Sequence, residues 1–274
     1  MDYASGVWGY RSYNKPNNVH NRAQRAFLGV HRFTSNVVVN GDMGWTPPNV
    51  RRKLDILRLW YRLDKMQNSR LTKRIYLWDK CSKANNWSRD CKRVLQEANL
   101  FDMWDNNTLA LKDLLQLAKS NLMDLEIKKW QKDLFSQNKL RTYRLYKTEY
   151  GSENYVMCNL SKSVRSFIAK IRSSTLPLRI ETGRFEKLKE EERLCKFCNT
   201  VVENEYHFIF ECHIYNHIRI SFISNILTFH PDFMNLESKE KWKIIMCDNR
   251  IVPKLGKYIC DAFYYRNKLV YNHQ

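Results

Sequence analysis

The sequence predicts an all-α protein, a helical bundle with a small Cys3His zinc-binding module near the C-terminus. Three observations support this class. Apolar residues recur at three- and four-residue steps through most of the chain, which is the period of an amphipathic helix. Only 8 Gly and 6 Pro occur among 274 residues, too few for a β fold dense in tight turns. Three cysteines and a histidine between residues 195 and 212 have the spacing of a structural metal site.

The charge balance favours a polyanionic partner. The chain has 47 Lys and Arg against 28 Asp and Glu, a formal charge of +19, which is typical of proteins that bind RNA or DNA. No run of about twenty apolar residues occurs, so no membrane partner is expected. The first residues lack the pattern of a secretory signal, and we therefore expect a nuclear or cytoplasmic, reducing location. In such a location, clustered cysteines indicate metal ligands before disulfides.

We expect three segments along the chain. The first, residues 1–45, contains a helix over 19–30 followed by a loop rich in Gly and Asn. The second, residues 46–180, is a basic helical region. The third, residues 181–274, holds the metal module and its flanking helices.

The basic region opens with a strong helix signal. Thr46 can cap this helix, two prolines fit its first turn, and residues 49–66 continue without a breaker. Leu54, Leu57 and Tyr61 recur at three- and four-residue steps, so they predict the buried side.

The other side of this helix carries cations. Four of them, from Arg51 to Lys65, follow steps of seven, four and three residues and so share one face. Residues 51–100 hold 14 Lys and Arg against 5 Asp and Glu, with aromatic residues such as Trp78 among them. Cations contact phosphates and rings stack on unpaired bases, although a solvated helix face and core aromatics are the alternative. The candidate nucleic-acid contacts are Arg51, Arg58, Arg62, Lys65, Arg70, Lys73, Arg74 and, in the metal module, Lys196.

Further helices are expected along the rest of the chain, with Ser88 and Ser161 as N-caps of two of them. A stretch over 175–185 with Pro177 and Gly183 interrupts the helical pattern and predicts a boundary. The expected helices cover residues 71–81, 88–99, 109–135, 161–174, 206–228, 238–247 and 254–270.

The cysteine cluster predicts one structural zinc. Cys195 and Cys198 form a C-x2-C knuckle, and His207 and Cys212 complete a Cys3His set from the start of the next helix. Thiolates and imidazole select zinc over magnesium or calcium. Four protein ligands leave no open position for an activated water, which argues against a metallohydrolase.

Two alternatives to this ligand set remain. His213 and His217 lie four residues apart, and either could replace His207 if the helix begins elsewhere. The four side chains could also be packed in a small core without a metal, since Cys is common in cores.

The sequence contains no recognisable catalytic pattern. It lacks G-x-S-x-G, the phosphate-binding G-x-x-x-x-G-K-[ST] and H-E-x-x-H. It also lacks an adjacent Asp pair of the kind that holds magnesium for nucleotidyl transfer. We therefore expect no enzymatic activity from this chain on its own.

Several stretches together resemble the non-LTR retrotransposon reverse transcriptases. The segment CKFCNTVVENEYHFIFECHIYNHIR is similar to the zinc-binding segment downstream of their polymerase domain. ASGVWGY, HNRAQRAFLGVHRFTSN, VNGDMGW and RRKLDILRLWYRL resemble the stretch that follows the palm and enters the thumb and connecting helices, and LPLRIETGRF has its counterpart just before the knuckle. The resemblance runs from about Ser5 to Tyr215, and residues 26–46 and 192–215 are its most distinctive parts.

The resemblance implies a role in binding RNA template and target DNA during target-primed reverse transcription. It carries the ligand role to Cys195, Cys198, His207 and Cys212, but no catalytic residue, because the Tyr/Phe-x-Asp-Asp of the palm does not occur. The polymerase and endonuclease domains of such an enzyme would then be missing partners. The alternative is a host-retained or degenerate fragment that acts as a protein-interaction scaffold without binding nucleic acid.

Overall fold

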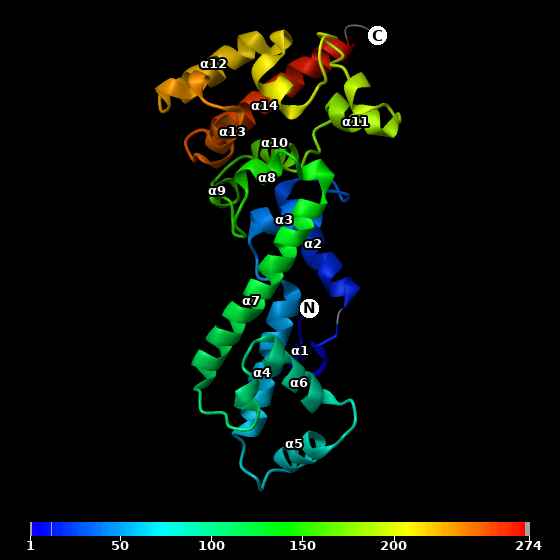
Figure 1. Ribbon diagram of the computed structural model, residues 1–274, viewed down its shortest axis with the longest axis vertical. Helices are drawn as coiled ribbons and strands as arrows, with labels where there is room; N and C mark the ends of the chain where they lie inside the picture. The colour runs from blue at the N-terminus through cyan, green and yellow to red at the C-terminus, as the bar shows by residue number, and fades with distance from the viewer. Residues whose placement is uncertain (1, 12, 272–274) are drawn as a thin grey trace. The chain divides into compact units, whose positions relative to one another are not determined.

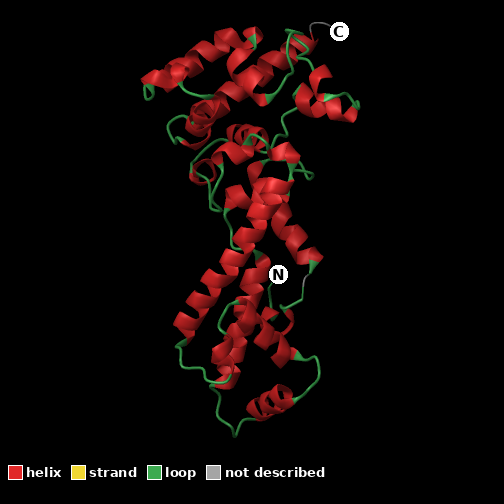
Figure 2. Ribbon diagram, in the orientation of Figure 1, coloured by secondary structure: helices red, strands yellow, loops and turns green. Residues whose placement is uncertain are grey.

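The computed structural model describes residues 2–11 and 13–271, and all regular elements in them are helical (Figures 1 and 2). The all-α class is therefore confirmed. The only pairing of extended residues found among them is an isolated antiparallel bridge between Leu194 and Val202. The α-helices are α1 (Ser5–Trp8), α2 (Asn14–Leu28), α3 (Asn36–Met43), α4 (Pro48–Asp64), α5 (Leu71–Cys81), α6 (Trp87–Glu97), α7 (Leu111–Ser136), α8 (Tyr143–Tyr146), α9 (Asn154–Met157), α10 (Lys162–Arg172), α11 (Arg179–Phe185), α12 (Asn216–Leu227), α13 (Ser238–Cys247) and α14 (Val252–Tyr271).

The chain forms two compact units, and their boundaries differ from the three expected segments. Unit 1 comprises residues 1–20 and 45–132, and unit 2 comprises residues 21–44 and 133–274. Residues 133–180, expected in the basic region, therefore belong with the metal module. All three boundaries, at 20/21, 44/45 and 132/133, fall inside or directly after a continuous helix, where sequence composition shows no sign of a break.

The core of unit 1 lies between α4, α6 and the first part of α7. Leu57 and Trp60 of α4 are fully buried, and the Trp60 ring stacks on Trp104 with a centroid separation of 6.1 Å. Asn121 of α7 donates a hydrogen bond to the Ala98 carbonyl at 2.6 Å and so ties α7 to the end of α6. The buried residues of this core are Val50, Leu54, Ile56, Leu57, Trp60, Tyr76, Cys91, Val94, Leu95, Ala98, Trp104, Leu114, Ala118 and Leu122.

Three expected helix caps have different outcomes. Ser161 caps α10, where its hydroxyl accepts from the Val164 amide at 3.3 Å. Ser88 does not cap α6, because Asn86 takes that role by accepting from the Arg89 amide at 3.0 Å. The start of α4 follows Pro47 with no side-chain cap, so Thr46 does not act there either.

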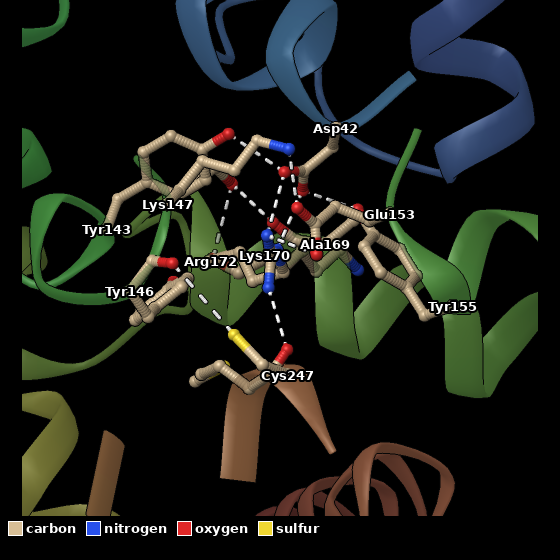
Figure 3. Close-up of polar contacts among 12 residues, drawn as sticks. Asp42, Tyr143, Tyr146, Lys147, Glu153, Tyr155, Ala169, Lys170, Arg172 and Cys247 are labelled. Atoms are coloured by element: carbon tan, nitrogen blue, oxygen red, sulfur yellow. Dashed lines mark hydrogen bonds and ion pairs between the residues drawn. The ribbon is translucent and has the colours of Figure 1, made fainter. Parts of the chain in front are cut away.

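Unit 2 is organised around a buried ion pair between α3 and α10 (Figure 3). Asp42 accepts from Arg172 Nε at 2.8 Å and Nη2 at 2.9 Å, and both side chains have no exposed surface. The hydroxyls of Tyr143 and Tyr155 donate to the same carboxylate at 2.8 and 2.7 Å. The Arg172 guanidinium also donates to the Met246 carbonyl of α13 at 3.1 Å. One carboxylate and one guanidinium thus link five helices, α3, α8, α9, α10 and α13.

The groups around this pair keep their protonation states because of burial and of one another's charge. Burial, followed by the Asp42 charge, raises the pKa values of Tyr143 and Tyr155 well above their ordinary value, so both phenols stay protonated donors. Burial by itself would lower the pKa of Arg172, but Asp42 and the groups around it outweigh burial and raise it. A second carboxylate, Glu153, lies 3.1 Å from Arg172 and also pairs with Lys147.

Close packing of α10 on α14 completes the link to the C-terminal helices. A Cβ atom at Gly256 would lie 2.6 Å from Val164 and 2.9 Å from Ile168, so glycine is needed where the two helices meet. This contact, with the Arg172 bond to α13, explains why residues 133–180 belong to unit 2. Within the described residues, no helix is both long enough and apolar enough to serve as a membrane span.

Replacing Arg172 by Met is expected to lower the free energy of unfolding of unit 2 by about 3–5 kcal/mol, because Asp42 would stay buried without its counter-charge. Hydrogen exchange of the α10 and α13 amides measures this loss. Lys162→Met, at an exposed position of the same helix, is the control and is expected to change the same free energy by less than about 0.5 kcal/mol. An equal effect of the two substitutions would contradict the central role of the pair.

Candidate metal centre and basic groove

The first two candidate ligands lie on a tight knuckle. The Cys195 amide donates to the Val201 carbonyl at 2.9 Å, and the Asn199 amide donates back to the Cys195 carbonyl at 2.8 Å. Asn199 has a φ of 51°, a left-handed conformation that Asn tolerates better than most residues. This turn directs the thiols of Cys195 and Cys198 to the same side.

The other two candidate ligands, His207 and Cys212, lie in a turn that precedes α12. The helix expected over 206–228 is therefore wrong in its first part. Residues His207–Glu211 form one π-helical turn, a short 3-10 turn follows, and α12 begins at Asn216. The Cys212 amide donates to the His207 carbonyl at 2.8 Å, which closes the π turn. Arg219 then donates to the Cys212 carbonyl at 2.6 Å and fixes the end of that turn.

The four ligand atoms converge as predicted. They lie within 4.8 Å of one another, and this Cys3His group could hold a metal ion. The Cys195 and Cys212 sulfurs are 3.9 Å apart, and the Cys198 sulfur is 3.3 Å from His207 Nε2. His207 is only 4% exposed, whereas His213 and His217 are exposed and lie outside the group. The structure therefore selects His207 among the three candidate histidines.

A carboxylate orients the His207 ring. His207 Nδ1 lies 3.3 Å from Glu211 Oε2, one π turn further along the chain. A carboxylate at this nitrogen favours the tautomer with the proton on Nδ1 and leaves the Nε2 lone pair free for an ion. The Asn204 side chain accepts from the His207 amide at 2.8 Å and holds the start of the turn. Glu211 was missed in the sequence, although its position four residues after a candidate ligand was a usable signal.

The four side chains share protons. The hydrogen bond to Cys212, together with burial, raises the pKa of the Cys195 thiol to about 12. The same bond lowers the pKa of Cys212, which accepts it. The contact with Cys195 raises the pKa of His207 to about 9 despite burial. At pH 7 the Cys195 thiol and the His207 imidazole therefore both hold a proton that a metal ion must displace.

Glu203 connects the knuckle to the helices around it. Its buried carboxylate pairs with Arg266 of α14, with an Nη2–Oε2 distance of 3.1 Å, and accepts from the Arg179 amide of α11 at 2.8 Å. The Cys195 sulfur lies 3.8 Å from the same carboxylate. This pair could not be predicted from local sequence, because Glu203 and Arg266 are 63 residues apart in the chain.

The candidate nucleic-acid contacts are exposed with one exception. Arg51, Arg58 and Arg62 on α4 reach the surface, as does Lys65 directly after this helix. Leu54 and Leu57 on the opposite side are buried. Arg70 and Arg74 near the start of α5 and Lys196 on the knuckle of unit 2 are exposed as well.

Lys73 does not share this exposure. It is 6% exposed, and its ammonium group donates to the Asp64 carbonyl at 2.6 Å, which stabilises the end of α4. The expectation that Lys73 contacts nucleic acid at the surface is therefore wrong. Its charge also lies over the Tyr76 ring at 5.2 Å from the centroid, which explains why a lysine is accepted at a buried position.

A groove of about 980 Å³ lies where α1 approaches α4 in unit 1. Arg58, Arg62 and Lys65 line it together with apolar side chains that include Val7 and Leu59. Two acidic residues share the lining: Asp55 pairs with Arg58, and Asp2 pairs with Arg51 just outside it. Both arginines are about half exposed, so these are surface pairs of small energy that a phosphate can replace.

Comparison of the chain with protein-family models, with curated proteins and with solved structures finds no match.

Titration of the protein with Zn²⁺ at pH 7 is expected to release at least about two protons per bound ion, because Cys195 and His207 both hold protons at that pH. The apparent affinity should therefore fall as the pH is lowered and rise as it approaches 9. Calorimetry in buffers of different ionisation enthalpy counts the protons. Binding without proton release would contradict the proton sharing described for the four side chains.

Proposed function

We propose that this chain is a zinc-stabilised, nucleic-acid-binding helical region, equivalent to the part that follows the polymerase palm in non-LTR retrotransposon reverse transcriptases. In this role it binds RNA template and target DNA and contributes no catalytic group of its own. Polymerase and endonuclease activities would come from other domains of the same enzyme.

The observation that carries the proposal is the row of exposed cations along one groove. Phosphates of a bound strand can contact Arg58, Arg62 and Lys65, while unpaired bases cover the apolar part of the lining. A duplex hides its bases, so the mixture of cations and apolar side chains favours RNA or single-stranded DNA. The formal charge of +19 adds a long-range attraction to any polyanion.

Zinc is the ion that the donor set and its spacing favour. Tetrahedral zinc with Zn–S bonds of about 2.3 Å separates two sulfur ligands by about 3.8 Å. The Cys195 and Cys212 sulfurs are 3.9 Å apart, so the site needs little rearrangement to accept the ion. Four protein ligands make this a structural site that would join the knuckle to α12 and, through Glu203, to α11 and α14.

The wild-type chain is expected to contain one zinc, and Cys212→Ser is expected to lose most of it because three ligands hold zinc much more weakly than four. Elemental analysis of the purified protein gives the zinc content per chain. Cys81→Ser, at an exposed cysteine of unit 1, is the matched control, and His213→Ala tests the rival ligand; both should retain the ion. Zinc loss in His213→Ala with full retention in Cys212→Ser would overturn the assignment.

Joint replacement of Arg58 and Arg62 by Ala is expected to weaken binding of single-stranded RNA and to flatten its salt dependence. Each phosphate contact on a single strand contributes about 0.7 to the slope of log K against log salt concentration, so the slope should decrease by about 1.4. Fluorescence anisotropy with a labelled oligonucleotide over a salt series measures both quantities, with wild-type dissociation constants of order micromolar at low salt.

The control for this experiment is joint replacement of Lys239 and Lys243, two exposed lysines four residues apart on α13. It removes the same charge without touching the groove and should change the slope little. No binding of RNA or DNA by the wild-type chain at low salt would favour the alternative, a fragment that acts only as a protein scaffold. An equal slope change in both double variants would show that net charge alone, rather than the groove, binds the strand.

A further inference from the structure

Helix α5 packs polar and aromatic residues against the rest of unit 1 and exposes its aliphatic residues to solvent. Its inner side is held by polar and aromatic groups: buried Lys73 donates to the end of α4, and Lys80 donates to the Trp104 carbonyl at 3.0 Å and lies over the Trp104 ring. Buried Tyr76 meets the Trp87 ring edge-on at 6.3 Å. A solvent-exposed helix ordinarily buries its aliphatic residues and exposes its lysines. Here the arrangement is reversed.

The outer side of α5 is an apolar stripe, formed by Leu71, Ile75 and Trp78. These residues follow the i, i+4, i+7 spacing of one helix face and are 70%, 55% and 74% exposed. Contiguous exposed apolar surface often marks an interaction site, because exposed apolar residues lower solubility without stabilising the fold. Figure 1 shows α5 at one end of unit 1.

The charges beside the stripe restrict what can cover it. Arg70 and Arg74 are exposed along its edge, and the nearest acidic side chain of the helix, Asp79, already accepts from the Ser88 amide at 3.0 Å. A partner therefore has to supply acidic groups at the rim. A second copy of this chain would bring arginine against arginine, so self-association is disfavoured.

Two other kinds of partner fit less well. Nucleic acid could stack a base on Trp78, but two exposed cations, Arg70 and Arg74, lie beside the stripe, against three in the groove beside α4. Helices that lie on membrane surfaces keep several cations on the side opposite their apolar stripe. In α5 the lysines of that opposite side are engaged in packing, which leaves no cationic side for lipid headgroups.

We propose that the stripe of Leu71, Ile75 and Trp78 is a docking site for an amphipathic helix of a partner protein that carries acidic residues along the edge of its own apolar face. Recognition by one apolar stripe at i, i+4 and i+7 is a general mode of helix binding. Trp78 is the anchor, because large aromatic residues contribute most to such contacts. The stripe is separate from the groove beside α4, which is lined by Arg58, Arg62 and Lys65, although Arg70 and Arg74 at its edge are also candidate nucleic-acid contacts.

The test uses the full chain and a labelled 18-residue helical peptide with leucines on one face and glutamates on both flanks. A matched peptide carries lysines in place of the glutamates. Fluorescence anisotropy is expected to show binding of the acidic peptide at least about tenfold tighter than of the basic one. Ile75→Ser and Trp78→Ser should each lower that affinity by about tenfold or more. Leu117→Ser, at an exposed leucine on α7, is the control and should leave the affinity unchanged.

Because both substituted residues are exposed, the variants should unfold at the same temperature as the wild-type chain, which separates docking from stability. Equal affinity for the two peptides, or an unchanged affinity in Trp78→Ser, would overturn the proposal. A loss of single-stranded RNA binding in Ile75→Ser as large as in the Arg58 and Arg62 double variant would assign the stripe to nucleic acid instead. Stripe-dependent co-sedimentation with phosphatidylserine vesicles, or stripe-dependent dimerisation of the chain, would likewise overturn it.

Discussion

The buried pair of Asp42 and Arg172 is the constraint on which unit 2 depends. A charge without access to water is tolerated only when its partner and its remaining hydrogen bonds are all in place. Asp42 therefore fixes Tyr143 and Tyr155 as well as the guanidinium, and the guanidinium fixes α13 through the Met246 carbonyl. Because these contacts come from five helices, the helices have to adopt one arrangement for any of the charges to be satisfied. The aliphatic packing around the pair supplies most of the apolar burial, but it tolerates small shifts that the charge network does not.

The same principle explains how the candidate metal centre is attached. Glu203 is buried beside the knuckle and pairs with Arg266 of α14, and its Oε2 atom also accepts from the Arg179 amide at the start of α11. The knuckle is thus bonded to its surroundings through one carboxylate, independently of any ion. The four candidate ligand atoms already lie within 4.8 Å of one another, so the chain would lose little conformational entropy when an ion binds. These polar contacts hold the module in place together with its buried apolar residues Phe208, Ile209 and Tyr215.

The basic segment of unit 1 divides into parts with different chemistry. On α4, Arg51, Arg58 and Arg62 are exposed and present charge to a ligand, while Leu54 and Leu57 are buried. Another cation of this helix, Arg52, is buried. On α5 the pattern is reversed, since Lys73 and Lys80 are engaged inside and the apolar stripe is outside. Two neighbouring helices with similar composition are thereby suited to different partners. The net charge of the segment could not have distinguished them.

The sequence by itself determined the helical class, the three cysteines of the candidate metal site and the cationic side of α4, while the structure selected His207 as the fourth member of the group. These features depend on residues close together in the chain, where the periods of helices and the spacing of metal ligands apply directly. The unit boundaries, the Asp42 and Glu203 networks and the inversion of α5 were decided only by the tertiary structure. Each depends on residues brought together from distant parts of the chain, and whether a lysine such as Lys73 is buried follows from which carbonyl lies within its reach. The periodicity of the sequence contains no information about the distance between the Lys73 ammonium group and the Asp64 carbonyl.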